Sequence, residues 1–319
     1  KIPAGAPLEA RLAQLSAADQ EQLADVFRVT SMTFAALGGA EQVTAFFKRH
    51  GSRSYEQRIY LELADFYVRQ EQVNEAARTW MALAQREPGT ALAPRLLMQA
   101  IELYRQAGFQ QRVLETETVF VRDYGLHSDY WIQHSLEDFP DVLQALQVSL
   151  QELAHVAHAQ ARETDSEVDY RSAERWYRAW LAGFGATPGA AEMNYQLAEL
   201  LYESGQYQPA IEEYERTAWS RGEHQHAAAA ALGVLHASDR LLQQEKLADR
   251  EAVSEHAREA TLRFVLRYPD HAAATGLLGT MGTALLQQQR YDTALGVSER
   301  VLSETAAAPA GLRQAAWSI

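Results

Sequence analysis

The histidine side chains are the first candidates for chemistry in this chain, which has ten of them. His155 and His158 are three positions apart and would share one face of a helix. His224 and His226 are two positions apart, in a stretch that we expect to be a turn. Neither pair has an acidic residue at a spacing that completes a site, and a catalytic zinc ion normally needs three protein ligands. We therefore interpret both pairs as structural or exposed, and we predict no metal and no cofactor.

Paired carboxylates are the second candidate, because they can divide general acid and general base work between them. Glu115 and Glu117 form one pair, and Glu212 and Glu213 form another. Each pair falls at polar positions of a predicted amphipathic helix, so we expect solvated helix faces. The absence of cysteine excludes disulfides, thiolate metal sites and cysteine nucleophiles. No glycine-rich phosphate loop and no Gly-x-Ser-x-Gly motif occurs. We predict that the chain is not an enzyme and has no catalytic residues.

The charge balance excludes further classes of protein. The net charge is −13, and the 29 basic residues include only three lysines and no basic cluster, which disfavours nucleic-acid binding. No run of about 18 apolar residues is present, so no membrane span is predicted in this fragment. The chain opens with a loose Pro/Gly segment, residues 1–7. We expect that an upstream piece has been removed, and a signal peptide or lipid anchor would fit.

The elements that must position these residues are helices. Ser16 and Asp19 form a capping box before a predicted helix at 17–36, which Gly38 and Gly39 should end. A second, short helix is predicted at 41–49, ended by Gly51. Residues 1–54 are therefore expected to be an N-terminal linker and helical cap.

A helical hairpin then recurs along the chain. Predicted helices at 60–70 and 74–85 carry Ala64, Tyr67 and Ala76 on their apolar faces. Similar residues return at 197–214 and at 281–301. The second helices repeat a pair of alanine and an aromatic residue four positions apart, which places both on one helix face. These pairs are Ala76/Trp80, Ala173/Tyr177, Ala210/Tyr214 and Ala260/Phe264.

The recurring pattern resembles the tetratricopeptide repeat (TPR), a hairpin of 34 residues. The resemblance implies an all-α fold, a right-handed α-α superhelix (solenoid) of TPR-like hairpins, with Trp80, Tyr177, Tyr214 and Phe264 in the core. We expect TPR-like hairpins over 55–186, partly degenerate, and over 187–319, with the array continuing beyond the fragment.

Several departures from the repeat are also predicted. A degenerate hairpin should cover 92–124, an irregular link 130–140, and an unusually long helix 141–162, which pairs with a helix at 169–182. Helices at 227–243 and 249–266 should be joined by an extended turn. Thr187 is expected to cap a helix that begins at Pro188, and this place is the predicted joint of the array.

Stacked hairpins expose a long concave surface, so the leading hypothesis is a scaffold or adaptor that binds a partner protein or peptide there. First-helix residues not used for packing are the candidates for that contact. They are Arg58, Glu62, Asp65, Asn194, Glu199 and Glu203. Cytosolic TPR co-chaperones capture a C-terminal carboxylate with lysine and asparagine, and the shortage of lysine argues against such a clamp here.

The ends of two second helices suggest a location. Residues 264–271 read Phe-Val-Leu-Arg-Tyr-Pro-Asp-His, and residues 120–125 are looser. These endings resemble those of Gram-negative cell-envelope TPR proteins, both periplasmic proteins and outer-membrane lipoproteins. The resemblance implies a periplasmic or outer-membrane-associated location and a role in assembling envelope complexes. The alternative is a non-catalytic positioning module of a larger enzyme, or a cytosolic regulatory protein.

Overall fold

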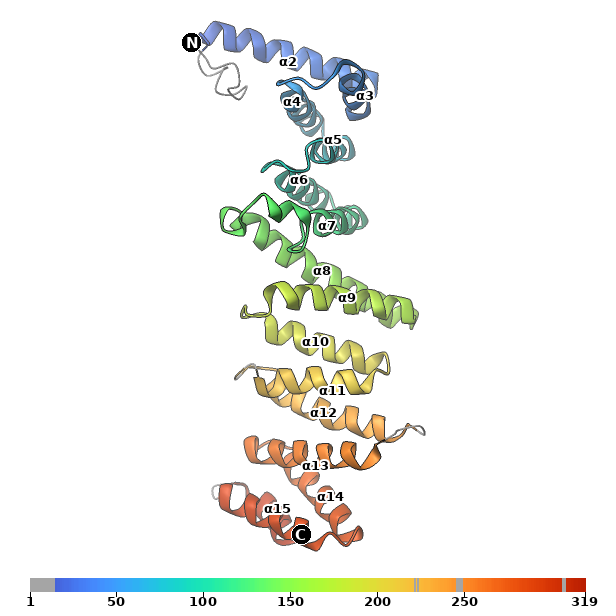
Figure 1. Cartoon of the computed structure of the whole chain (residues 1–319), viewed down its shortest axis with the longest axis vertical. Coiled ribbons are helices and arrows are strands. Elements are labelled where there is room, and N and C mark those ends of the chain that lie inside the picture. Colours follow the sequence, from blue (N-terminus) through green and yellow to red (C-terminus); the bar gives the residue numbers. More distant parts are fainter. Residues whose placement is uncertain (1–14, 221, 223, 245–248, 306–307) are drawn as a thin grey trace. The chain divides into compact units, whose positions relative to one another are not determined.

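Helices make up all the regular structure that is described for this chain. A computed structural model describes residues 15–220, 222, 224–244, 249–305 and 308–319, and over these residues it has fifteen α-helices and three shorter 3-10 or π-helical segments. Successive helices form antiparallel pairs (Figure 1). The predicted all-α class is confirmed. The predicted loose segment at 1–7 lies outside the described residues.

The chain divides into two compact units, Lys1–Leu153 and Ala154–Ile319. The first unit contains α2 (Ala17–Leu37), α3 (Ala40–His50), α4 (Glu56–Arg69), α5 (Val73–Arg86), α6 (Ala93–Gln106), α7 (Gln110–Tyr124), η1 (Asp129–Ile132) and η2 (Leu136–Asp138). The division falls inside α8 (Pro140–Thr164). The second unit contains α9 (Glu167–Phe184), α10 (Ala190–Glu203), α11 (Tyr207–Glu215), η3 (Arg216–Ser220), α12 (Ala227–Leu242), α13 (Arg250–Arg267), α14 (Ala274–Gln287), α15 (Tyr291–Glu304) and α16 (Ala310–Trp317). The predicted domain boundaries and the superhelix stay predictions.

The N-terminal helices begin and end where capping chemistry places them. The backbone N–H of Asp19 donates to the Ser16 hydroxyl (3.2 Å), so the predicted start of α2 is confirmed. Gly38 ends α2 in the left-handed region, with φ of 118°. Gly51 follows the last residue of α3. The two predicted helices at 17–36 and 41–49 are therefore confirmed to within one residue at each end.

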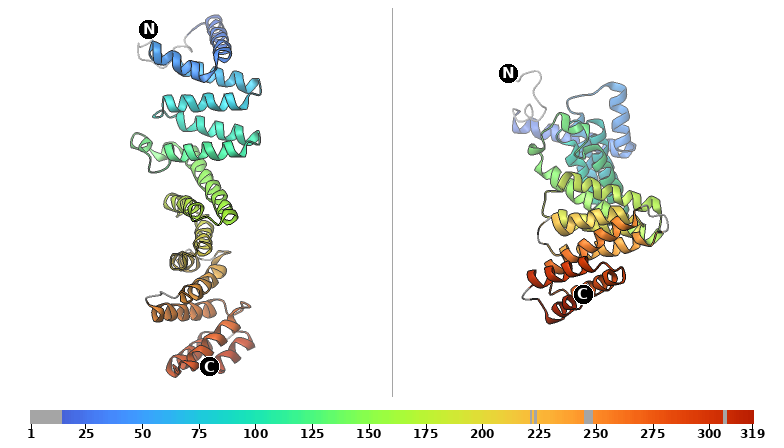
Figure 2. Two further views of the ribbon diagram at one scale, coloured as in Figure 1. Left: turned by 90° about the vertical axis from the view of Figure 1, so that its right-hand side faces the viewer. Right: turned by 60° about the horizontal axis from the view of Figure 1, so that its bottom comes forward.

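Two regular hairpins, α4/α5 and α6/α7, follow in the first unit. The left view of Figure 2 shows residues 56–124, in cyan to green, as helices lying side by side. Tyr60, Leu63 and Ala76 are fully buried between them. Trp80 differs from the prediction, because it is only half-buried while its neighbour Thr79 is buried completely. Ala76 of the expected pair is therefore in the core, whereas Trp80 lies at its edge.

The predicted irregular link consists of the two short 3-10 segments η1 and η2. Tyr130 is buried there, edge-on to Tyr124 at a ring-centroid distance of 5.0 Å. The guanidinium of Arg95 in α6 donates to both carboxylate oxygens of Asp141 (2.7 and 3.0 Å) at the start of α8. The link and the 25-residue helix α8 confirm two of the predicted departures.

The second unit buries the other three predicted pairs. Tyr177, Tyr214 and Phe264 are each at most 2% exposed. Gly233 of α12 lies against the Tyr214 ring, and a Cβ atom there would come within 2.6 Å of that ring. These helices are therefore packed through the residues that the repeat pattern predicted.

The predicted helix start at Thr187 is wrong. The hydroxyl of Thr187 donates back to the Phe184 carbonyl (2.7 Å), and its backbone N–H donates to the same oxygen (2.9 Å). Thr187 therefore closes the turn after α9 and does not cap the next helix. That helix, α10, begins at Ala190 after Gly189.

Candidate functional site

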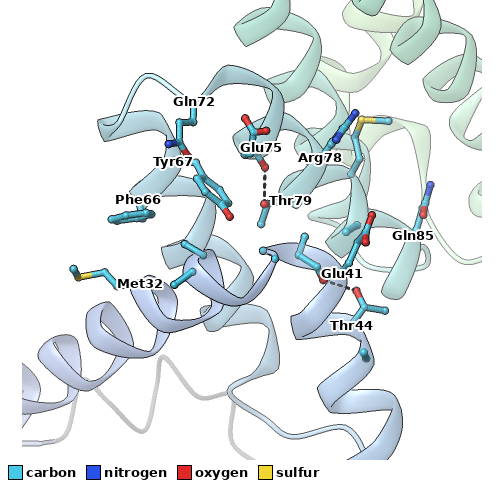
Figure 3. Close-up of a pocket in the computed structure, with 18 of the residues that line it drawn as sticks. Met32, Glu41, Thr44, Phe66, Tyr67, Gln72, Glu75, Arg78, Thr79 and Gln85 are labelled. Atoms are coloured by element: carbon cyan, nitrogen blue, oxygen red, sulfur yellow. Dashed lines mark hydrogen bonds between the residues drawn. The ribbon is translucent and has the colours of Figure 1, made fainter.

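A groove of the first unit opens between the pair α2/α3 and the pair α4/α5. Its volume is about 1190 Å³. Figure 3 shows side chains from all four helices around it. The groove lies entirely within residues 32–85. We take it as the candidate binding site and call it the α2–α5 groove.

Two local features bring the walls of the α2–α5 groove together. Gly39 has φ of 69°, and a Cβ atom there would come within 2.6 Å of the Tyr67 hydroxyl. Only glycine allows the α2–α3 turn to approach α4 this closely. Below the turn, the hydroxyls of Thr44 in α3 and Tyr60 in α4 are hydrogen-bonded at 2.7 Å. The turn sequence and this bond therefore fix α3 against α4.

The lining of the α2–α5 groove is amphipathic. In Figure 3, Met32 and Phe66 lie on one side of the opening. Arg78, Glu41 and Gln85 lie on the other side. Gln72 lies on the same side as Phe66 in Figure 3, so the lining mixes apolar and polar side chains within one groove, as a ligand with both kinds of surface requires.

Four charged side chains of the lining are unpaired within the part of the chain that the structure describes. Glu41, Lys48, Glu75 and Arg78 have no ion pair within 4.0 Å among the described residues. Most other arginines of the first unit are paired, for example Arg58 with Glu62 and Arg86 with Glu56. The groove thus presents both positive and negative side chains, which could pair with opposite charges on a partner.

The apolar side of the groove continues onto the exposed face of α2. Val26, Val29, Met32 and Leu37 are each about half exposed or more, between 49% and 63%. Met32 belongs to both surfaces, because it also lines the groove. Exposed apolar residues that gather beside a groove mark an interaction surface better than scattered ones do.

None of the predicted site residues of α4 lines this groove. The Arg58 guanidinium donates to the Glu62 carboxylate (2.5 Å). Asp65 is exposed. The contribution of α4 to the groove comes instead from Phe66 and Tyr67. The role of Arg58, Glu62 and Asp65 in binding a partner stays a prediction.

The predicted site residues of α10 are tied to their own unit. Asn194 is fully buried, and its amide donates to the backbone carbonyl (3.0 Å) and a carboxylate oxygen (2.9 Å) of Glu213. The structure thus places Asn194 in the core, because its amide satisfies a buried carboxylate. Glu199 accepts a hydrogen bond from the Tyr214 hydroxyl (2.6 Å). The predicted partner contact of these residues is untested.

Glu203 joins a network around a buried histidine. It accepts from the Arg162 guanidinium (2.8 and 2.5 Å) and lies 3.0 Å from His158 Nε2. The other ring nitrogen of His158 is 3.1 Å from the Tyr177 hydroxyl. Burial lowers the pKa of His158 and outweighs the carboxylate of Glu203, which raises it. The lowered pKa favours the uncharged form of His158, which suits its buried position in the core.

The histidines do not gather into a metal site in the described part of the chain. His155 is exposed, whereas His158 is 3% exposed. His224 Nε2 is 2.9 Å from the Thr217 carbonyl, and His226 pairs with Glu192. Within the described ranges, no three His, Cys, Asp or Glu side chains are placed to hold a metal ion.

The expected solvation of the two glutamate pairs is wrong for one member of each. Glu115 and Glu212 are exposed, but Glu117 and Glu213 are buried, at 0% and 4% exposure. Glu117 accepts from Arg105 (3.0 Å) of α6 and from the Ser149 hydroxyl (3.2 Å) of α8. A buried carboxylate needs such partners, and they come from helices that sequence spacing does not relate to Glu117.

The sequence did contain a signal for the α2–α5 groove. Ala35, Ala36 and Leu37 make the end of α2 apolar on more faces than one core contact can cover, and Gly38 and Gly39 follow at once. An apolar helix end beside a glycine turn could have been interpreted as part of a partner-binding surface. In the described residues, no helix is both long and apolar enough to cross a membrane.

Comparisons with known proteins give no family. No family model matches the chain, and no curated protein matches it. Among solved structures, the MamA protein aligns with a TM-score of 0.30 and 15% identity, covering 69% of this chain and 97% of that one. The TPR2AB domain of yeast Sti1, in a complex with pHSP90, has a TM-score of 0.27 and 13% identity, covering 81% and 96%. A tetratricopeptide repeat protein from Parabacteroides merdae aligns with a TM-score of 0.25 and 13% identity, covering 82% of this chain and 98% of that one. These TM-scores are low, so the fold described above rests on the helices of this chain.

Proposed function

We propose that this chain is a non-catalytic protein-binding scaffold and that the α2–α5 groove holds an amphipathic helix or peptide of a partner protein. The observation that carries the proposal is the groove itself, about 1190 Å³, whose lining combines apolar side chains with charged ones that have no ion pair among the described residues. A partner segment with one apolar and one polar face would cover Met32 and Phe66 while its charges meet Arg78 and Glu41.

The apolar contacts would supply most of the affinity. Burying apolar surface contributes roughly 25 cal/mol per Å² before the costs of association are subtracted. The charged side chains would select the partner, because a like charge placed against them would be repelled and would lose its water. A segment with the wrong charge order should therefore bind weakly even where its apolar face fits.

A photo-reactive amino acid tests the site directly. Gln85 is exposed and lines the groove, whereas Gln111 in α7 is exposed and lies outside it. With the photo-reactive group at position 85, irradiation in the native host should cross-link a discrete partner. The same group at position 111 is the matched control. Equal cross-linking from both positions would contradict a specific groove.

A charge in the apolar wall tests the contact independently. Met32→Asp should reduce the cross-linked partner by about tenfold, because a carboxylate would be desolvated against the partner. Val148→Asp is the control, since Val148 in α8 is 50% exposed and does not line the groove. Both substitutions are at exposed positions, so circular dichroism melts should match the wild type. If Met32→Asp captured as much partner as Val148→Asp, the groove would not be the binding site.

We propose that the protein binds its partner in the cell envelope. Support comes from the sequence endings at 264–271 and 120–125, which resemble those of envelope TPR proteins. The partner would then be a component of an envelope complex. Fractionation of the native host with an antibody to this chain tests the location. Recovery of the protein in the cytosolic fraction would contradict the envelope assignment and leave the scaffold proposal standing.

A further inference from the structure

The carboxyl group of Glu117 in α7 is fully buried, and one of its oxygens has no hydrogen-bond partner among the described residues. The Oε1 atom accepts hydrogen bonds from the Arg105 guanidinium (3.0 Å) of α6 and from the Ser149 hydroxyl (3.2 Å) of α8. The Oε2 atom is the one without a partner. A charged oxygen at that place loses its water without a compensating hydrogen bond, so burial favours the protonated form of this carboxyl group.

One guanidinium serves three carboxyl groups around Glu117. Arg105 is 3.0 Å from Glu117 and 3.0 Å from Glu152 of α8. It also lies 3.5 Å from Glu102 of α6. Gln110 of α7 adds an uncharged donor to Glu152 (2.8 Å). When all three carboxyl groups are ionised, negative charge is in excess, and the most buried of them is the one that gains most from a proton.

Helix α8 meets this cluster through a single turn. Ser149 and Glu152 are three positions apart, so both project from one face of α8. The start of α8 is tied to α6 as well, because the Arg95 guanidinium donates to Asp141 (2.7 and 3.0 Å). From Asp141 to Ser149 is eight positions, or about 12 Å of helix. The cluster is therefore a second polar attachment of this part of α8, two turns beyond the first.

Ionisation of Glu117 would weaken the second attachment. The charged carboxylate would compete with Glu152 for Arg105, because one guanidinium cannot neutralise both. The Glu152 side chain is 25% exposed and can turn into water, whereas Glu117 is 0% exposed and cannot. Since Ser149 reaches Glu117 from α8, a movement of that turn would let water reach the Oε2 atom. Both changes remove contacts between α8 and the hairpin α6/α7.

We propose that Glu117 is a pH-dependent switch for the attachment of α8 to α6 and α7. With the proton bound, Arg105 and Ser149 hold the first part of α8, residues 141–152, on the hairpin. When the proton is lost, that part of α8 detaches more often while the rest of the first unit stays folded. The switch is separate from the α2–α5 groove and needs no partner protein.

The direction of the pH effect follows from proton linkage. Burial and the neighbouring Glu152 raise the pKa of Glu117 from 4.5 to about 7. In the detached state water reaches the carboxyl group, and its pKa returns toward the ordinary value. The attached state therefore binds the proton more tightly, and detachment becomes easier as the pH rises from 4.5 to about 7.

Hydrogen exchange of the whole chain, followed by mass spectrometry, measures the detachment. Protection of residues 141–152 should fall by about tenfold or more between about pH 5.5 and about pH 8, after correction for intrinsic exchange rates. At the higher pH these residues should also exchange faster than those of α4, because α4 stays folded when α8 detaches.

Two substitutions separate the switch from a general loss of stability. Glu117→Gln has no proton to lose at this position, so residues 141–152 should be equally protected at both pH values. Glu152→Gln removes the competitor for Arg105 and should reduce the loss of protection at high pH. Glu115→Gln is the matched control, because Glu115 is exposed on the same helix as Glu117. It should behave as the wild type.

Three results would overturn the proposal. The first is equal protection of residues 141–152 at both pH values in the wild type. The second is a pH-dependent loss that Glu117→Gln and Glu152→Gln leave unchanged. The third is a loss shared equally by α4 and α8, which would show that the first unit unfolds as a whole. If circular dichroism showed that Glu117→Gln does not fold, the partly exposed Glu152→Gln would decide the second point.

Discussion

The helical pattern of the sequence does not reveal every buried side chain that affects stability, and Glu117 is one of them. Glu117 lies in the core of the first unit, where one arginine serves three carboxylates. Arg105 is 3.0 Å from Glu117 and from Glu152, and 3.5 Å from Glu102. Burial and the neighbouring Glu152 raise the pKa of Glu117 from 4.5 to about 7. This carboxyl therefore titrates near neutral pH.

The stability of the first unit should fall as pH rises through the range set by Glu117. The folded pKa is above the unfolded one, so the folded state holds the proton more tightly. The contribution is complete below pH 4.5 and lost above about pH 7. Over that window it amounts to about 3 kcal/mol, at about 1.4 kcal/mol per pKa unit. Glu117→Gln should therefore flatten the stability–pH curve measured by urea unfolding.

The control for this experiment is on the same helix. Glu115 is exposed, so Glu115→Gln should leave the curve of the wild type unchanged. Parallel curves for the wild type and Glu117→Gln would show that Glu117 does not set the pH dependence. The sequence could not reveal this residue, because Arg105 and Ser149 are 12 and 32 positions away from it. Helical periodicity reports one helix face and not the neighbours that cover it.

At the scale of single helices, the contact between α11 and α12 depends on one glycine. A Cβ atom at position 233 would lie 2.6 Å from the Tyr214 ring. That ring cannot withdraw easily, since it is 2% exposed and its hydroxyl donates to Glu199 (2.6 Å). The close approach of the two helices therefore requires the absence of a side chain at this position.

Gly233→Ala should destabilise the protein by about 1–3 kcal/mol through overpacking. This cost should exceed the gain of about 1 kcal/mol that alanine normally gives inside a helix. Gly279 in α14 is the matched control, because a Cβ atom there has no atom within 4 Å. Gly279→Ala should stabilise by about 0.5–1 kcal/mol. Thermal and urea unfolding of both variants would measure this, and a stabilising Gly233→Ala would refute the contact.

Most helices were predictable, and their exact ends were less so. Capping residues such as Ser16 and Gly38 act through their own neighbours, so the sequence predicts α2 correctly. Thr187 was misassigned because its hydroxyl can satisfy either the helix before it or the helix after it. The structure shows that it bonds to Phe184. The choice depends on the packing of α9 and α10, which the local sequence does not contain.

At the scale of the whole chain, each compact unit has its own core. Leu63 of α4 belongs to the first unit and Leu197 of α10 to the second, and both are 0% exposed. In a chain of stacked hairpins each hairpin contacts mainly its neighbours. A cavity created in one unit should therefore destabilise that unit and leave the stability of the other unit unchanged.

Leu63→Ala and Leu197→Ala should each cost about 2–5 kcal/mol. Their effects should add in the double variant to within about 0.5 kcal/mol, because the two sites share no contacts. Hydrogen exchange followed by mass spectrometry would locate them. Faster exchange of α10–α15 in Leu63→Ala would show that the two units unfold together.

The hairpins of this protein follow from repeating residues, but its grooves do not. The α2–α5 groove opens between two helix pairs. It depends on the relative placement of several helices, and no single residue marks it. The predicted contact residues were accordingly sought on first helices, whereas the α2–α5 groove uses Lys48 and Arg78 on second helices.

The scarcity of lysine makes one wall of the α2–α5 groove chemically distinct. The chain has lysines only at positions 1, 48 and 246, and Lys48 lines the groove. Lys48 is the one lysine within the described ranges. An amine-acylating reagent can therefore modify few lysine side chains besides Lys48. A partner bound in the groove should slow the acylation of Lys48, and mass spectrometry would measure that rate.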